Sequence, residues 1–106
     1  MTTEERIREL IGKNRVFLFM KGNPDYPQCG FSMKAVSILK ALGVQYSTFD
    51  ILSDPAIRQG VKDFSNWQTF PQLYVDQQLV GGSDIMMEMW EQGELEGLVK
   101  DVPRAG

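Results

Sequence analysis

The chain has 106 residues, 42% of them hydrophobic and 24% charged, which is the composition of one ordinary globular domain, so we expect a single domain over residues 1–106. Its net charge of -3 argues against the basic surface that nucleic-acid binding needs, and no stretch reaches the ~18 apolar residues of a membrane span. One cysteine, Cys29, and no histidine exclude an internal disulfide, histidine-dependent catalytic pairs and imidazole metal sites.

The charges are unevenly distributed along the chain. Residues 1–40 contain seven basic and four acidic side chains, whereas residues 41–106 contain four basic and ten acidic ones. We therefore expect an anionic ligand to bind near the first half. The first ten residues lack the apolar segment of a signal peptide, and a lone cysteine suits a reducing compartment. We expect a cytoplasmic protein, or one of an organelle stroma or matrix.

The first predicted element is an amphipathic helix that begins near Thr2. Thr2 and Glu5 have the spacing of a capping box. The helix should end at Gly12 or Lys13. Its apolar residues recur at helical intervals, at Ile7, Leu10 and Ile11.

A buried strand and a loop follow this helix. Val16–Met20 is a continuous apolar run, as expected for a central strand covered on both faces. Residues 22–28 contain a glycine and two prolines, which predicts a loop. A helix over residues 31–42, capped by Gly43, and an alternating strand over residues 45–51 come next. A strand, a helix and a strand in this order predict that the two strands are parallel.

A third helix and a hairpin occupy the next part of the chain. Asp54-Pro55 supplies a capping side chain and a proline suited to the first helical position, so we expect a helix from there to about residue 64. Two short apolar runs, Gln72–Val75 and residues 78–80, are separated by two residues, which is the spacing of a tight antiparallel hairpin.

Two helices complete the predicted fold. The first covers residues 84–92, with inward side chains Ile85, Met89 and Trp90. The second begins at Glu94, with inward side chains Leu95, Leu98 and Val99. The elements thus alternate between helix and strand for most of the chain, which indicates an α/β fold.

Cys29 lies at the first turn of the second predicted helix, after the proline-containing loop. Unpaired amide groups and the helix dipole stabilise a thiolate at such a position. Lys21, at the end of the first strand, would lie nearby and lower the thiol pKa. Ser32 cannot form a disulfide, but its hydroxyl can donate a hydrogen bond to the thiolate. The alternatives are a buried structural cysteine, a surface lysine and a solvent-facing serine.

The segment Cys29-Gly30-Phe31-Ser32, preceded by Lys21 and Pro27, resembles the active-site motif of the monothiol, CGFS-type glutaredoxins. The resemblance continues, in the expected order and spacing, through residues 67–72 and 81–84, and it spans nearly the whole chain. It implies a thioredoxin-like fold in which helices flank a central four-stranded mixed sheet.

The resemblance also implies a glutathione site. The Phe70-Pro71 bond would be cis, and the backbone of Phe70 would pair with the cysteinyl group of glutathione. Residues 82–84 would hold its γ-glutamyl end, and Arg58 and Lys62 its glycine carboxylate. An ordinary capped helix start and a solvated helix face are the respective alternatives. The implied glutathione contacts are Lys21, Phe31, Arg58, Lys62, Thr69, Phe70, Pro71, Gly82, Ser83 and Asp84.

Two positions depart from the usual pattern of this family. Gln68 stands where proline is usual, which loosens the loop before Phe70. Ser83 stands where a second cysteine is frequent, so the internal disulfide proposed for such members cannot form. We interpret Trp67 and Trp90 as core or partner surface, rather than as cofactor contacts.

The resemblance implies a function in iron-sulfur chemistry. A [2Fe-2S] cluster generally takes four thiolates, and this chain supplies one, Cys29. A homodimer with two glutathione molecules would complete the set. The leading hypothesis is a carrier that receives the cluster from an assembly scaffold and passes it to recipient apo-proteins. A BolA-like protein is a further implied partner, and neither nucleic acid nor a membrane is expected.

Two other functions remain open at the sequence level. Because Ser32 replaces a resolving thiol, a disulfide oxidoreductase would have to use glutathione as the second thiol, and we expect this activity to be weak. An inert interaction module of the same fold would instead leave the pKa of Cys29 near the ~8.5 of a free thiol.

Overall fold

The computed structural model describes residues 1–105, and its helices and strands follow the predicted order. A short 3-10 helix, η1, was not predicted. The elements are α1 (Thr3–Ile11), β1 (Val16–Met20), α2 (Gly30–Leu42), β2 (Ser47–Asp50), η1 (Ile51–Ser53), α3 (Pro55–Ser65), β3 (Gln72–Val75), β4 (Gln78–Gly81), α4 (Ser83–Glu91) and α5 (Glu94–Leu98).

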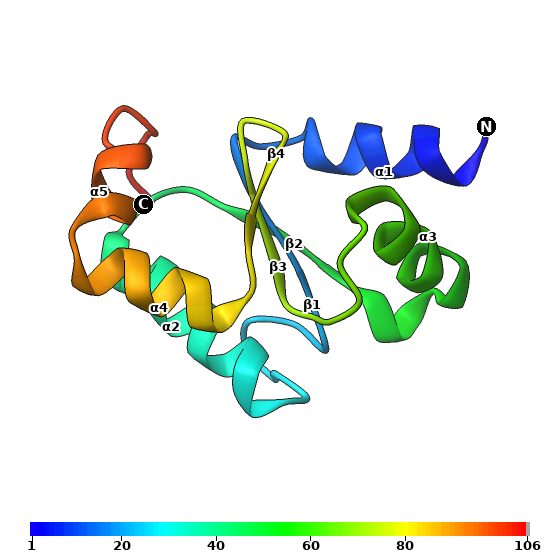
Figure 1. Ribbon diagram of the computed structural model, residues 1–106, viewed down its shortest axis with the longest axis horizontal. Helices are drawn as coiled ribbons and strands as arrows, with labels where there is room; N and C mark the ends of the chain where they lie inside the picture. Colours follow the sequence, from blue (N-terminus) through cyan, green and yellow to red (C-terminus); the bar gives the residue numbers. More distant parts are fainter. Residues whose placement is uncertain (106) are drawn as a thin grey trace.

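The four strands form one mixed sheet in the order β2-β1-β3-β4. β1 pairs with β2 in parallel, as predicted, and with β3 antiparallel, while β3 and β4 form the antiparallel hairpin. Helices α2, α4 and α5 lie on one side of the sheet, and α1 and α3 lie on the other (Figure 1). This is the thioredoxin-like arrangement that the sequence resemblance implied.

β1 is central because its side chains supply the core on both faces of the sheet. All five residues of Val16–Met20 are buried. Side chains alternate between the faces of a strand, so Leu18 packs in the cluster under α2 and α4, whereas Phe17 and Phe19 pack in the cluster under α1 and α3. A continuous apolar run is what a strand covered on both faces requires.

The predicted caps and turn are present. Thr2 and Glu5 form the capping box of α1. Asp54 accepts hydrogen bonds from two backbone N–H groups at the start of α3 and pairs with Arg6 of α1 at 2.8 Å, which joins these helices. The two hairpin residues, Asp76 and Gln77, both have positive φ, as a type I′ turn requires.

Three details of the predicted elements are wrong. β2 is shorter than predicted because the Gln45 N–H donates to the Pro103 carbonyl and Ile51 begins η1. Trp90 and Leu98, predicted to point inward, are 40% and 43% exposed, and Met86 is the fully buried residue of α4. Hydrophobic spacing suggests which face of a helix is buried, but it does not tell how far neighbouring elements cover that face.

Within residues 1–105, none of the helices has both the length and the apolar character needed to cross a bilayer.

Candidate functional site

Cys29 is the N-cap residue of α2, directly after the loop that leaves β1. The loop closes on itself, because the Gln28 N–H donates to the Lys21 carbonyl at 2.9 Å. Asp50, at the end of β2, fixes the start of the loop by accepting a hydrogen bond from the Gly22 N–H at 2.9 Å. Cys29 is thereby held beside Lys21 at the carboxyl end of β1.

The environment of Cys29 favours the thiolate. Burial raises the pKa of the Cys29 thiol, but hydrogen bonds from the backbone N–H and hydroxyl of Ser32 and from the Phe31 N–H lower it, as does the charge of Lys21. The lowering effects prevail, so the pKa of Cys29 lies below its usual value. This agrees with the sequence prediction and argues against an inert interaction module.

Ser32 is placed to act as a donor to this sulfur. Its side chain is fully buried, so the solvent-facing alternative is wrong. Its Oγ accepts a hydrogen bond from the Lys21 N–H at 3.0 Å. Because the backbone already occupies the hydroxyl as an acceptor, its proton is available to the Cys29 sulfur.

Replacing Ser32 by alanine should raise the pKa of Cys29, because this substitution removes a hydrogen bond that favours the thiolate. The expected result is slower alkylation by iodoacetamide at pH 7 and a rate profile displaced to higher pH. Ser37→Ala is the matched control, since the Ser37 hydroxyl donates to the Met33 carbonyl in the same helix. Identical profiles for Ser32→Ala and Ser37→Ala would contradict the role of Ser32.

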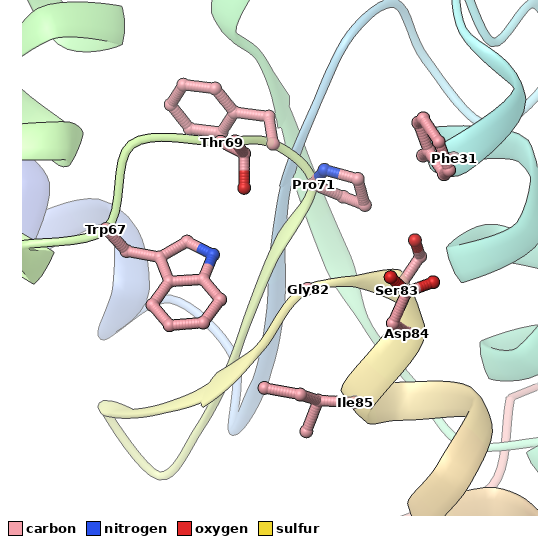
Figure 2. A pocket seen from close by; sticks show the side chains of 9 residues that line it. Phe31, Trp67, Thr69, Pro71, Gly82, Ser83, Asp84 and Ile85 are labelled. Carbon is pink, nitrogen blue, oxygen red and sulfur yellow. The ribbon is translucent and has the colours of Figure 1, made fainter.

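A cavity of about 250 Å³ lies next to the start of α2. It is formed by α2, the loop before β3 and the start of α4 (Figure 2). The Thr69 hydroxyl and the Trp67 indole N–H point toward the backbone of Gly82 across the cavity. The lining residues are Phe31, Trp67, Thr69, Phe70, Pro71, Gly82, Ser83, Asp84 and Ile85.

The structure brings together seven of the residues that the sequence assigned to a glutathione site. They are Phe31, Thr69, Phe70, Pro71, Gly82, Ser83 and Asp84. Lys21 is close enough to Cys29 to lower the pKa of its thiol. Arg58 and Lys62 are half-buried on α3 and do not line the cavity, so their contact with a ligand stays a prediction.

Two lining residues were not assigned to the site from the sequence. Trp67 was interpreted as core or partner surface, but it forms one wall of the cavity. Because Trp67 is the first residue of the motif of residues 67–72, its position could have indicated that it belongs to the site. Ile85 follows Asp84 in the first turn of α4 and lines the cavity below Gly82 in the view of Figure 2. Nothing in the sequence distinguishes this apolar residue from one that packs in the core.

The cavity offers backbone groups as well as side chains. The Phe70-Pro71 bond is cis, as the resemblance implied. The ring of Phe70 also packs in the core under α1 and α3. At the opposite wall, the N–H groups in the first turn of α4 have no partner within their helix, and such groups bind carboxylates. The arrangement therefore suits a small peptide that carries a carboxylate.

Gly22 and Gly30 provide a matched pair of substitutions around Cys29. A Cβ at Gly22, where φ is +85°, would lie 2.5 Å from the Tyr26 carbonyl oxygen and 2.8 Å from the Gln28 nitrogen. A Cβ at Gly30 would meet nothing within 4 Å. We expect Gly22→Ala to displace the loop and slow alkylation of Cys29 at pH 7, whereas Gly30→Ala preserves the rate. Equal rates in the two variants would contradict this role of the loop.

Comparison with known proteins identifies close relatives. The family model described as Glutaredoxin matches residues 16–80. A monothiol glutaredoxin of Arabidopsis thaliana is 51% identical over 98 residues, which cover 92% of this chain and 20% of the plant protein. The chain thus spans about a fifth of the length of the first plant relatives that it matches. An uncharacterized monothiol glutaredoxin of Synechocystis sp. is 50% identical over 98 residues, and the match covers 92% of each chain.

Solved structures show the same fold. The solution structure of reduced apo GrxS14 from poplar is 43% identical, has a TM-score of 0.81, and matches over 92% of this chain and 89% of that chain. The crystal structure of a buckwheat glutaredoxin-glutathione complex is 20% identical, has a TM-score of 0.83, and matches over 93% of this chain and 88% of that chain. At this identity, the buckwheat likeness concerns the fold alone.

Proposed function

We propose that this chain, which belongs to the monothiol glutaredoxin family, binds glutathione beside Cys29 and carries a [2Fe-2S] cluster as cargo between two copies of itself. The observation that supports this proposal most directly is the position of a reactive thiol next to the cavity. One thiol with a lowered pKa lies two residues before Phe31, which lines the cavity of about 250 Å³. A compartment rich in reduced glutathione, such as the cytoplasm or an organelle stroma or matrix, is where such a site would act.

Glutathione suits the chemistry of this cavity. Its thiol would lie at Cys29, its cysteinyl backbone beside the backbone of Phe70, and its γ-glutamyl carboxylate at the start of α4, near Ser83 and Asp84. The glutaredoxin family to which the chain belongs supports this choice. Lys21, Arg58 and Lys62 are the cations proposed for its glycine carboxylate.

The cluster requires ligands from more than one molecule. Within residues 1–105, no three His, Cys, Asp or Glu side chains converge as a metal site. Because it contains one cysteine, the chain contributes a single thiolate, Cys29, where a two-iron cluster generally takes four. A second chain and two glutathione thiols complete the set. Cys29 fits as one ligand because it is partly exposed and its pKa is lowered.

The surface around Cys29 suits a second protein. Tyr26, Phe31 and Met33 lie within four residues of Cys29 in the sequence and are more than half exposed, and exposed apolar side chains near a reactive group favour a contact surface. In the holo form this surface would meet a second copy of the chain. A BolA-like protein, an iron-sulfur scaffold and recipient apo-proteins are the other partners we propose for it.

A second candidate function is glutathione-dependent disulfide reduction, which the lowered pKa of Cys29 favours. The Cys29 thiolate would attack the glutathione sulfur of a glutathionylated protein and release the protein thiolate. A second glutathione thiolate would then attack the Cys29-glutathione disulfide, releasing glutathione disulfide and restoring the Cys29 thiolate. Ser32 cannot replace this second thiol, so turnover depends on free glutathione.

Anaerobic reconstitution with iron and sulfide separates the two functions. The carrier predicts visible absorption that requires glutathione, transfer of that absorption to an added apo-ferredoxin, and slow turnover of a glutathionylated peptide. A colourless protein that rapidly reduces the same peptide would make the oxidoreductase the correct function instead.

A further inference from the structure

Gln72, the first residue of β3, is fully buried, and its amide is hydrogen-bonded at both ends. Its Nε2 donates to the carbonyl oxygens of Trp67 at 2.9 Å and of Thr69 at 3.3 Å. Its Oε1 accepts a hydrogen bond from the Tyr74 hydroxyl at 3.1 Å. A buried amide with all of these partners is confined to one arrangement, because a displaced donor or acceptor would lose its bond without gaining one from water.

Tyr74 holds the oxygen end of this amide. Its buried ring packs edge-on against Phe19, with the centroids 5.7 Å apart, and at a tilt against Phe64, with the centroids 6.3 Å apart. Burial raises the pKa of Tyr74 above its usual value, so its hydroxyl remains a donor at neutral pH. Because the carbonyls of Trp67 and Thr69 can only accept, the amide nitrogen of Gln72 faces the loop, and its amide oxygen accepts from the Tyr74 hydroxyl.

The two carbonyls that Gln72 binds belong to the loop that forms one wall of the cavity. Trp67 is also held by Ser65, whose hydroxyl oxygen accepts from the Trp67 N–H at 3.1 Å and whose hydroxyl donates to the Trp67 carbonyl at 3.3 Å. The Thr69 carbonyl, in contrast, receives no hydrogen bond other than that from Gln72 among the contacts of residues 1–105. Gln72 thus anchors the middle of this loop to the core.

We propose that Gln72 is a positioning residue of the ligand site: through its buried amide it holds Trp67 and Thr69 in the arrangement that the ligand needs. Gln72 does not line the cavity itself, so it acts through the loop. The loop that Gln72 anchors also carries Phe70 and Pro71, which line the same cavity. The choice of ligand rests on the proposed glutathione function.

Gln72→Met keeps the length of the side chain and removes both bonds to the loop. The probe is S-methylglutathione, which has no free thiol and so reports on the cavity alone. We expect Gln72→Met to bind it roughly tenfold more weakly than the wild-type chain, because the ligand must then order a loop that has lost two hydrogen bonds to the core. Backbone ¹⁵N relaxation should show increased motion confined to residues 67–70.

Val75→Ala is the matched control for lost stability. Val75 is buried on the same strand but packs in the cluster under α2 and α4, away from the loop. It should lower the melting temperature and leave both the affinity for S-methylglutathione and the relaxation of residues 67–70 unchanged. Tyr74→Phe, which keeps the ring and removes the hydroxyl, should weaken binding of S-methylglutathione severalfold. If Gln72→Met does not fold, Tyr74→Phe tests the positioning role of Gln72 in its place.

Wild-type affinity and an ordered loop in both Gln72→Met and Tyr74→Phe would overturn the role of Gln72. Failure of the wild-type chain to bind S-methylglutathione would instead contradict the glutathione function. In that case the relaxation data still decide the role of Gln72: loop motion in Gln72→Met supports it, and a rigid loop contradicts it.

Discussion

Replacing Cys29 by serine should abolish both cluster binding and the mixed disulfide with glutathione. Cys29 is the only thiol in the chain, and a serine hydroxyl is neither a thiolate ligand nor a nucleophile toward disulfides. The fold should persist, because serine is a favoured N-cap residue and Cys29 makes no capping bond through its side chain.

Three readings test this substitution on one sample. The visible absorption after reconstitution should fall to background. Treatment with glutathione disulfide should no longer increase the mass of the protein. The melting temperature should stay within a few degrees of that of the wild type. Ser37→Ala, on the same helix, should retain full absorption. Colour that survives in Cys29→Ser would show that the cluster ligand lies elsewhere, and an unfolded variant would make Cys29 structural.

Replacing Leu18 by alanine should lower the free energy of unfolding by about 3–5 kcal/mol, the cost of a large cavity in a buried core. Leu18 is fully buried in β1, and it pairs with β2 on one side and β3 on the other. The loss is a large share of the ~5–15 kcal/mol by which such domains are stable. Denaturation with urea, followed by circular dichroism, measures it.

Leu52→Ala is the matched control, because Leu52 lies in η1 and is 45% exposed. Its loss should stay below about 1 kcal/mol, as is usual at an exposed position. Equal losses in Leu18→Ala and Leu52→Ala would contradict the central position of β1 in the core.

The fold could be predicted wherever local patterns and tertiary packing agree. Val16–Met20 is apolar throughout and occurs with the predicted bounds, and the caps at Thr2 and Asp54 are formed. Prediction was wrong for Trp90 and Leu98 because they lie in short helices, where the cover provided by neighbouring elements decides exposure. The sequence of a helix does not by itself determine how far neighbouring elements cover it.

The candidate site was predictable in its motifs but not in its supporting contacts. Three separated motifs placed Cys29, Thr69 and Asp84 near one site, and the structure brings the last two to one cavity beside the start of α2. Gln72 and Asp50 were missed, because their roles depend on hydrogen bonds to backbone groups that come close only in the folded chain. A polar residue in an apolar strand, such as Gln72, was the available signal.

In the proposed function, two copies of the chain and two glutathione molecules hold one cluster. Native mass spectrometry of the reconstituted protein tests it most directly, because it counts every component of the complex at once. We expect a species that contains two chains, two iron atoms, two sulfides and two glutathione molecules, and no such species for Cys29→Ser. A cluster-bound single chain, or a cluster-bound dimer without glutathione, would contradict it.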